Sequence, residues 1–169
     1  MEADARAIMA WRYPPPYAVY NTEADGDADE AVLFAEYLDT RSPYFAVRNE
    51  ALDPSGAVVG LFCYGSSAGV SLEAGAPHLL EADGSLNVGL GMRPDLTGRG
   101  LGLDFVLAGL AFGAERYHPT LFRFYTLAFN HRALNVYERA GFRRVGVVTQ
   151  RGLWGERDFI ELVKENTAR

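Results

Sequence analysis

The stretch "RPDLTGRGLGLDFV" at residues 93–106 places Gly98, Gly100 and Gly102 at alternate positions. The apolar run "SLNVGLGM" at 85–92 precedes it and predicts a strand. Apolar residues at helical spacing follow it, namely Leu103, Val106, Leu107, Leu110 and Ala114. A glycine-rich loop between a strand and a helix offers backbone amides at a helix N-terminus, where the helix dipole favours anions. The loop therefore predicts a phosphate or pyrophosphate site, and the alternative is a turn that only connects two elements.

Two well-known phosphate loops do not fit this stretch. A Walker loop ends in Gly-Lys-Ser/Thr, whereas Gly102 is followed by Leu103 and Asp104. A Rossmann fingerprint needs an acidic residue at the end of the next strand, and the segment 121–129 has none. A different kind of phosphate ligand is therefore expected.

The length and composition are those of an ordinary globular protein. The chain has 169 residues, 49% of them hydrophobic, so we expect a single domain over 1–169. The formal net charge is -6, which argues against nucleic acid or an anionic membrane as the main partner. Cys63 is the one cysteine of the sequence, so no internal disulfide forms. It falls on a predicted internal strand, which favours a buried and inert thiol.

The sequence also sets expectations for location and metal content. No apolar run is long enough to span a bilayer, and the charged start "MEADARAIMAW" lacks a signal-peptide core, so we expect a cytoplasmic protein without membrane partners. One cysteine and three scattered histidines do not form a zinc site, so we expect no metal. The oligomeric state stays open between a monomer and a homodimer.

The remaining pattern predicts a mixed α/β (α+β) fold. Helices are predicted at 3–11, 28–38, 103–114 and 131–141, and strands at 44–50, 57–65, 85–92, 121–129, 142–150 and 157–164. The central strand–helix–strand unit implies parallel pairing. The hairpins, with the turn "DPSG" in the first, imply antiparallel flanks.

A second motif indicates which kind of phosphate ligand the loop binds. The segment "NHRALNVYERAGF", Asn130 to Phe142, reads Asn-x-x-Ala-x-x-x-Tyr-x-x-x-Gly-Phe. It resembles the second conserved block of the GNAT N-acetyltransferase superfamily, and "TGRGLG" resembles the pyrophosphate loop of that superfamily. Thr97 stands where the family usually has Arg or Gln, and we expect Arg93 and Arg99 to compensate for the missing charge. Weaker cofactor affinity follows from this departure.

The resemblance implies a sheet with two splayed parallel strands, helices on both faces and acetyl-CoA in the gap between 85–92 and 121–129. The expected cofactor-binding residues are Leu90, Gly91, Met92, Thr97, Gly98, Arg99, Gly100, Leu101, Gly102, Asn130, Asn135 and Tyr137. An amide near Leu90 to Met92 would also stabilise the oxyanion of the tetrahedral intermediate. Purely structural roles stay open for some of them: the strand glycines could relieve crowding under the helices, and Asn130 could serve as an N-cap alone.

The resemblance implies catalytic roles as well. Tyr137 is the expected general acid toward the CoA thiolate, although its spacing with Ala133, Val136 and Ala140 also fits a core residue. The general base stays unassigned, because the strand 85–92 holds no carboxylate. The candidates are Glu81, Asp83 and Glu73 in the preceding loop, or Asn87 acting through a water, with His78 ranked below them, and each also fits a solvated loop or packing role.

The resemblance therefore implies an N-acetyltransferase that transfers acetyl by direct attack of a primary amine. The acceptor is a small molecule, a protein N-terminus or a lysine. The alternatives are a catalytically silent acyl-CoA-binding module and a protein that uses the loop for another phosphate ligand. Tyr13, Tyr17, Tyr20 and Trp154 could line an acceptor wall beside the acidic Asp25, Asp27 and Asp29, but the sequence alone favours packing and a solvated loop.

Overall fold

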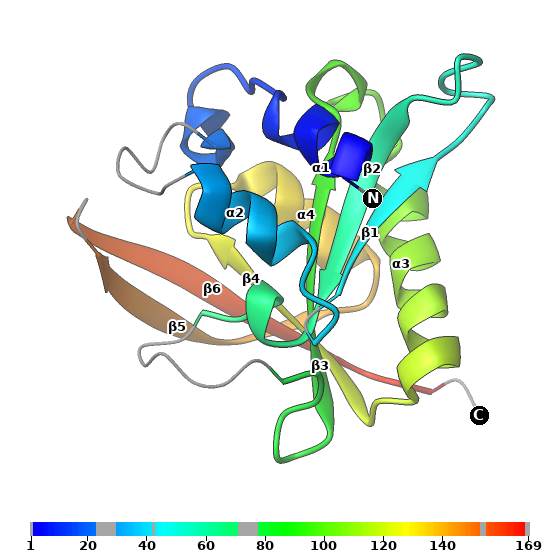
Figure 1. Cartoon of the computed structure of the whole chain (residues 1–169). Helices are drawn as coiled ribbons and strands as arrows, with labels where there is room; N and C mark the ends of the chain where they lie inside the picture. Colours follow the sequence, from blue (N-terminus) through cyan, green and yellow to red (C-terminus); the bar gives the residue numbers. More distant parts are fainter. Residues whose placement is uncertain (1, 23–29, 42, 71–77, 153–154, 168–169) are drawn as a thin grey trace.

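Figure 1 shows the fold in a computed structural model, which describes residues 2–22, 30–41, 43–70, 78–152 and 155–167. The helices are α1 (Glu2–Met9), α2 (Glu30–Tyr37), α3 (Gly102–Tyr117) and α4 (His131–Arg139). The strands are β1 (Tyr44–Arg48), β2 (Val58–Tyr64), β3 (Ser85–Met92), β4 (Leu121–Leu127), β5 (Arg143–Gly152) and β6 (Gly155–Glu165). Short 3-10 turns are η1 (Tyr17–Tyr20), η3 (Gly65–Ala68) and η4 (Pro94–Leu96).

The strands form one six-stranded sheet in the order β1-β2-β3-β4-β6-β5. The central pair, β3 and β4, is parallel, and every other pair is antiparallel. The helix α3 makes the crossover between the two parallel strands (Figure 1). The predicted mixed sheet with antiparallel flanks is therefore confirmed.

The two parallel strands stay together over only part of their length. Pairing is confined to Ser85–Asn87 of β3 and Leu121–Arg123 of β4. Beyond these residues β3 continues to Met92 and β4 to Leu127 without a shared ladder. The sheet thus opens into a gap at its centre, as expected for the splayed arrangement.

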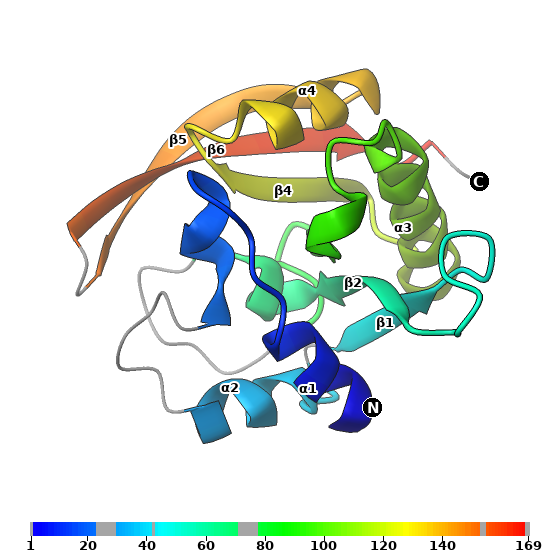
Figure 2. The same ribbon diagram turned by 90° about the horizontal axis from the view of Figure 1, so that it is seen from above.

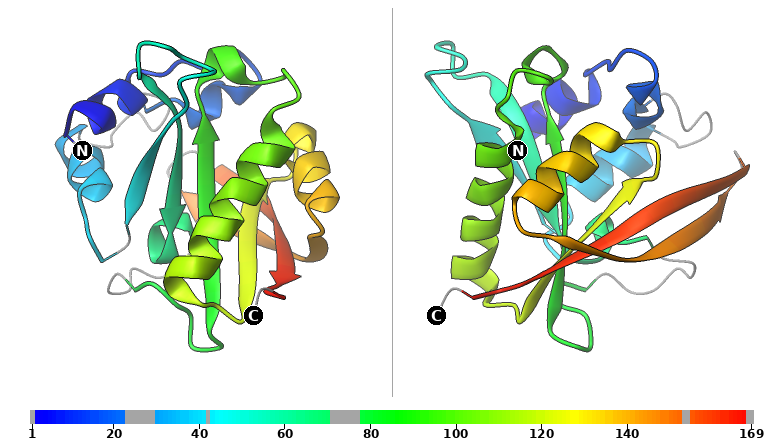
Figure 3. Two further views of the ribbon diagram at one scale, coloured as in Figure 1. Left: turned by 90° about the vertical axis from the view of Figure 1, so that its right-hand side faces the viewer. Right: turned by 180° about the vertical axis from the view of Figure 1, so that it is seen from behind.

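Helices cover both faces of the sheet. In Figure 3 (left) α3 crosses in front of the central strands with α4 to its right, and α1 and α2 lie at the left; seen from above in Figure 2, α4 and the pair α1 and α2 lie on opposite sides of the strands. The main core joins α3 and α4 to the inner strands through Val106, Leu134, Phe124 and Leu162. A smaller cluster joins Ile8 of α1 to Val58 and Leu61 of β2.

The helix α3 approaches the sheet closely because it carries glycines on its inner face. A Cβ added to Gly109 would lie 2.3 Å from the ring of Phe62, so only glycine fits there. The hydroxyl of Tyr64 donates a hydrogen bond of 2.8 Å to the carbonyl of Gly109. This contact fixes the helix, and with it the loop at its N-terminus, against β2.

The structure refines several expected boundaries. Each predicted helix and strand is present within a few residues, but η1 was not predicted. The first helix ends at Met9, before the proline run 14–16, and these prolines lead into η1, whose Tyr17 and Tyr20 lie toward the gap in the sheet. Within the described ranges, no helix has the length and hydropathy needed to cross a membrane.

Candidate active site

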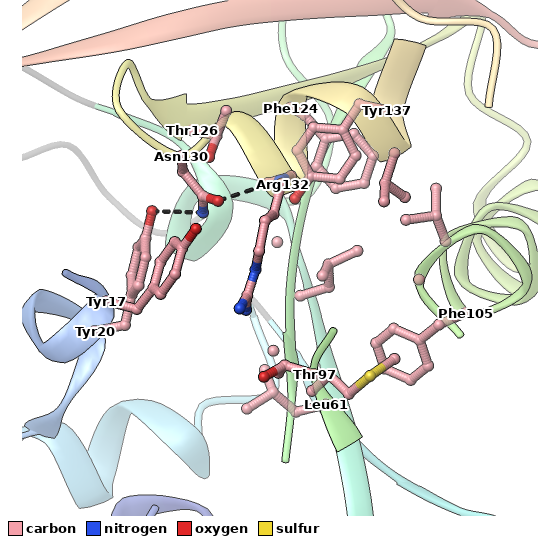
Figure 4. A pocket seen from close by; sticks show the side chains of 18 of the residues that line it. Tyr17, Tyr20, Leu61, Thr97, Phe105, Phe124, Thr126, Asn130, Arg132 and Tyr137 are labelled. Carbon is pink, nitrogen blue, oxygen red and sulfur yellow. Dashed lines mark hydrogen bonds between the residues drawn. The ribbon is translucent and has the colours of Figure 1, made fainter. Parts of the chain in front are cut away.

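A cavity of about 640 Å³ runs through the gap between β3 and β4. On one side it is lined by Val136 and Tyr137 of α4, and on the other by Tyr13 and Tyr37. Because the two strands diverge, the cavity connects both faces of the sheet. Figure 4 shows this cavity, with ten of the side chains that line it labelled.

The unpaired edge of β3 presents only some of its backbone groups to the gap. The Arg93 amide donates 3.0 Å to the Val59 carbonyl, which marks a hydrogen-bonded pair of the β2–β3 ladder. Hydrogen bonding alternates along an antiparallel pair. Gly91, which faces Leu61, therefore directs its N–H and C=O toward β2, and Leu90 and Met92 direct theirs into the gap. Of the three predicted amides, those of Leu90 and Met92 are available to a ligand.

The glycine loop is shaped for close approach of a ligand. Gly98 and Gly100 have φ values of +75° and +83°, a region that favours glycine. A Cβ at either residue would meet nothing within 4 Å, so both face open space. At the start of α3, Leu101 supplies no side-chain cap, which leaves the first amides of the helix for another partner. Gly98, Gly100 and Gly102 all line the cavity.

The expected compensation for Thr97 is not seen at Arg93. The guanidinium of Arg93 forms ion pairs of 2.6 Å with Asp53 and 2.7 Å with Asp95, and these hold it beside the β1–β2 turn. The hydroxyl of Thr97, which lines the cavity, donates 2.8 Å to the Pro94 carbonyl. These two carboxylates hold Arg93 away from the glycine loop, so the prediction that Arg93 compensates for the missing charge at Thr97 is wrong.

Three other predicted cofactor residues lie outside the cavity lining: Arg99, Leu101 and Asn135. Arg99 and Asn135 are exposed. Arg99 stands in the glycine loop between Gly98 and Gly100, so it lies next to the cavity without lining it.

Two arginines that the sequence analysis missed line the cavity. Arg132 and Arg139 of α4 are in the lining, together with Val136 between them. Spacings of four and three residues put all three on one side of the helix. Val136 packs on Gly102, because a Cβ added there would lie 3.0 Å from its methyl group. The helical spacing was a signal that could have identified these arginines as facing the glycine loop.

Tyr137 is buried, with 6% of its surface exposed, and lines the cavity. Its ring stacks on Phe124 with 4.2 Å between centroids and 6° between planes (Figure 4). Burial raises the pKa of its phenol above the usual 10.0, with the nearby Tyr20 as a smaller cause. Tyr137 therefore keeps its proton at neutral pH. Its ring packs in the core, as its spacing allowed, and it also borders the gap, while its role as general acid stays a prediction.

Asn130 is the N-cap of α4, since its Oδ1 accepts 3.1 Å from the Ala133 amide. Its Nδ2 donates 2.9 Å to the hydroxyl of Tyr20 (Figure 4). The predicted cap is therefore present. The same side chain ties η1 to the edge of the cavity.

The candidate bases fall into two groups. Asn87 is 3% exposed, and its Nδ2 donates 2.6 Å to Glu81, whose carboxylate also lies 3.1 Å from His78. Asp83 instead pairs with Arg123 at 3.1 Å and caps the Ser85 amide at the start of β3. None of these four side chains is in the cavity lining. Glu73 lies outside the described residues.

Cys63 also lines the cavity, on β2. It is 7% exposed, and burial raises the pKa of its thiol to about 12. Such a thiol stays protonated and is a poor nucleophile, in agreement with the inert thiol that the sequence predicted. Among the described residues, no group of three His, Cys, Asp or Glu side chains is arranged to hold a metal ion.

A comparison with protein families identifies the family of this chain. Residues 1–143 match the family described as acetyltransferase (GNAT) domain. The chain belongs to the GNAT acetyltransferase family. The resemblance drawn from the two sequence motifs is thereby confirmed.

Solved structures share this GNAT fold at low sequence identity. A chimera of the spermidine N-acetyltransferase SpeG from Vibrio cholerae and hSSAT is 14% identical, with a TM-score of 0.70, covering 98% of this chain and 92% of that one. AAC(6')-Ib, in complex with ribostamycin and coenzyme A, is 19% identical, with a TM-score of 0.69 and coverages of 98% and 90%. Campylobacter jejuni N-acetyltransferase PseH, in complex with acetyl coenzyme A, is 17% identical, with a TM-score of 0.55 and coverages of 81% and 77%. No curated protein matches the chain.

Proposed function

We propose that this GNAT protein, acting as one domain over 1–169, transfers the acetyl group of acetyl-CoA to a primary amine. One observation carries the proposal: the glycine loop, the open edge of β3 and Tyr137 all border a single cavity. Relatives of the same fold bind coenzyme A or acetyl coenzyme A, which supports the choice of co-substrate.

The residues present fit acetyl-CoA in three places. The amides of the loop at Gly98 and Gly100, with the N-terminus of α3, suit the pyrophosphate. Arg132 and Arg139 on α4 supply the positive charge that Thr97 lacks. The N–H and C=O groups of Leu90 and the N–H of Met92, which face the gap in place of the missing ladder with β4, suit the amides of the pantetheine arm.

The reaction proposed is direct attack within a ternary complex. The amine nitrogen forms a bond to the acetyl carbon, and the carbon–sulfur bond breaks. The phenol of Tyr137, protonated because its pKa is raised, donates to the departing sulfur. An amide of β3 stabilises the oxyanion that forms between these steps. The cavity lining holds no candidate base among the described residues, so the amine loses its proton to water or to a group reached through water.

The second candidate is an acyl-CoA-binding module without activity. The lack of a carboxylate on β3 favours it, because the strand offers Asn87 in place of an acidic base. A discontinuous assay separates the two. Purified protein is incubated with acetyl-CoA and a panel of primary amines, and free thiol is measured with a chromogenic disulfide. Amine-dependent CoA release supports the enzyme, whereas binding of acetyl-CoA without release for every amine supports the module.

A further inference from the structure

We infer that the acceptor is an amine carried on an aromatic ring, an arylalkylamine, bound against a wall of aromatic side chains. The inference rests on the proposed function and names the substrate class of that same site. The wall consists of Trp11, Tyr13, Tyr17, Tyr20 and Tyr37, all of which line the cavity. The sequence alone favoured packing for the three tyrosines of this wall that it considered, and Trp154 lies outside the described residues.

The wall is held in place by contacts among its own members and with the sheet. The rings of Tyr13 and Tyr20 meet edge to face, with centroids 6.4 Å apart. Tyr37 meets Tyr44 of β1 in the same way at 4.7 Å. Tyr20 accepts the hydrogen bond of Asn130. A wall fixed in this way loses little freedom when a flat ligand packs on it, which favours binding.

The wall lies next to the place proposed for the acetyl group. The hydroxyl of Tyr13 donates 2.8 Å to the carbonyl of Met92, at the end of the open edge of β3. A Cβ added to Gly91 would lie 3.6 Å from that hydroxyl, so the glycine lets the wall approach the strand. An amine one or two carbons from a ring on this wall can therefore reach the gap.

The wall also presents a ring face that binds a cation. The guanidinium carbon of Arg132 lies 4.1 Å from the centroid of the Tyr17 ring. Figure 4 shows Tyr17 and Tyr20 together, with Arg132 extending past them into the cavity toward Thr97. In the proposed complex Arg132 turns to the pyrophosphate, and this ring face is then open to an ammonium group or to the plane of another aromatic group. An arylalkylamine carries both features, and a polyamine carries only the charge.

The test compares an aromatic amine with its saturated analogue, which differs only in the ring, and with two polyamines that have no aromatic ring. With acetyl-CoA saturating, CoA release is measured for 2-phenylethylamine, 2-cyclohexylethylamine, spermidine and ribostamycin. We expect kcat/KM for 2-phenylethylamine to exceed that for its saturated analogue by about 3-fold and that for spermidine by about 10-fold, the range that aromatic contacts give. A preference for spermidine or ribostamycin, or equal rates for the ring and its saturated analogue, would overturn the inference.

A binding measurement separates this inference from the proposed function. Each amine is titrated calorimetrically into protein saturated with CoA, which binds without turnover. Heat from spermidine alone, with CoA release from spermidine, overturns the acceptor class and leaves the enzyme in place. CoA that fails to bind, together with no release from any amine, overturns the proposed function and the inference with it.

Two variants of one residue test the wall itself. Tyr17→Leu removes the ring, and Tyr17→Phe keeps it. We expect the leucine variant to raise KM for 2-phenylethylamine by about 3- to 10-fold, and the phenylalanine variant to restore it. Phe112→Leu removes an exposed ring on α3 outside the cavity and serves as the control. Equal KM values in Tyr17→Leu and the parent protein would contradict a role of the wall in binding the acceptor.

Discussion

The ring of Tyr137 lies flat on the ring of Phe124, with 4.2 Å between centroids and 6° between the planes. The contact joins α4 to the strand β4 at the border of the cavity. The contact fixes the ring and leaves the hydroxyl group available for proton transfer. The two roles of Tyr137 can therefore be separated by removing one oxygen.

We predict that Tyr137→Phe lowers kcat by at least about 10-fold and changes the Kd for acetyl-CoA less than 2-fold, the size of one lost contact to a reacting group. The stacked ring is retained, so the fold should hold. The measurement is steady-state CoA release together with calorimetry. Tyr117→Phe is the matched control, because that buried hydroxyl has no hydrogen-bond partner among the described residues and lies outside the cavity. An unchanged kcat in Tyr137→Phe would remove the role of the phenol.

Gly100→Glu is expected to abolish binding of acetyl-CoA, because the new carboxylate would occupy the proposed pyrophosphate position. The residue has φ +83°, so any side chain there strains the backbone locally, but the Cβ position faces open space and meets no neighbouring atom. Gly56→Glu is a close control, since Gly56 has φ +73° and open space too, but lies in the β1–β2 turn. If the folded Gly100→Glu protein bound acetyl-CoA as tightly as Gly56→Glu, the loop would not hold the pyrophosphate.

Arg132→Gln should weaken acetyl-CoA binding by about 3- to 10-fold, as expected for an exposed charge that contacts phosphate. The loss should be largest at low salt and shrink as salt is added, because salt screens the same interaction in the parent protein. Kd is measured by calorimetry at two ionic strengths. Arg144→Gln, which removes a charge paired with Glu138 away from the cavity, should leave Kd unchanged. Identical Kd values for the two variants would exclude a phosphate contact at Arg132.

Stability should fall above about pH 10. Burial raises the pKa of Tyr64 and Tyr137 above the usual 10.0. Both stay protonated in the folded protein while the same residues ionise in the unfolded chain, so the unfolded state binds fewer protons and gains stability as pH rises. Each contributes a loss of at most about 1.4 kcal/mol per pH unit between its unfolded and folded pKa values. Urea midpoints at pH 8, 10 and 11 check this, and equal midpoints at pH 8 and 11 would contradict it.

The sequence predicted the elements well because their signals are local. The strand 85–92 and the helix that begins at Gly102 follow from apolar spacing and from the glycines between them. The parallel pairing of β3 and β4 follows from the single helix that connects them. The gap between the two strands was predicted only from the family resemblance, because no residue spacing in the sequence indicates how far two strands stay paired.

The residues that sequence analysis placed wrongly, or missed, depend on contacts between distant segments. Arg93 is drawn away from the loop by Asp53, which lies 40 residues earlier in the chain. Tyr13 reaches Met92 across 79 residues. Arg132 could have been placed by its spacing from Val136, a local signal, but its direction toward the loop depends on the packing of α4 on α3.

The most direct test of the central claim is a parallel calorimetric titration of the parent protein with acetyl-CoA, CoA, ATP and NAD. A loop and an open strand edge that together hold a pyrophosphate and a pantetheine arm predict heat with acetyl-CoA and CoA, and none with ATP or NAD. Binding of ATP or NAD as tight as that of acetyl-CoA, or no heat from any of the four, would contradict the assignment of this cavity to acetyl-CoA.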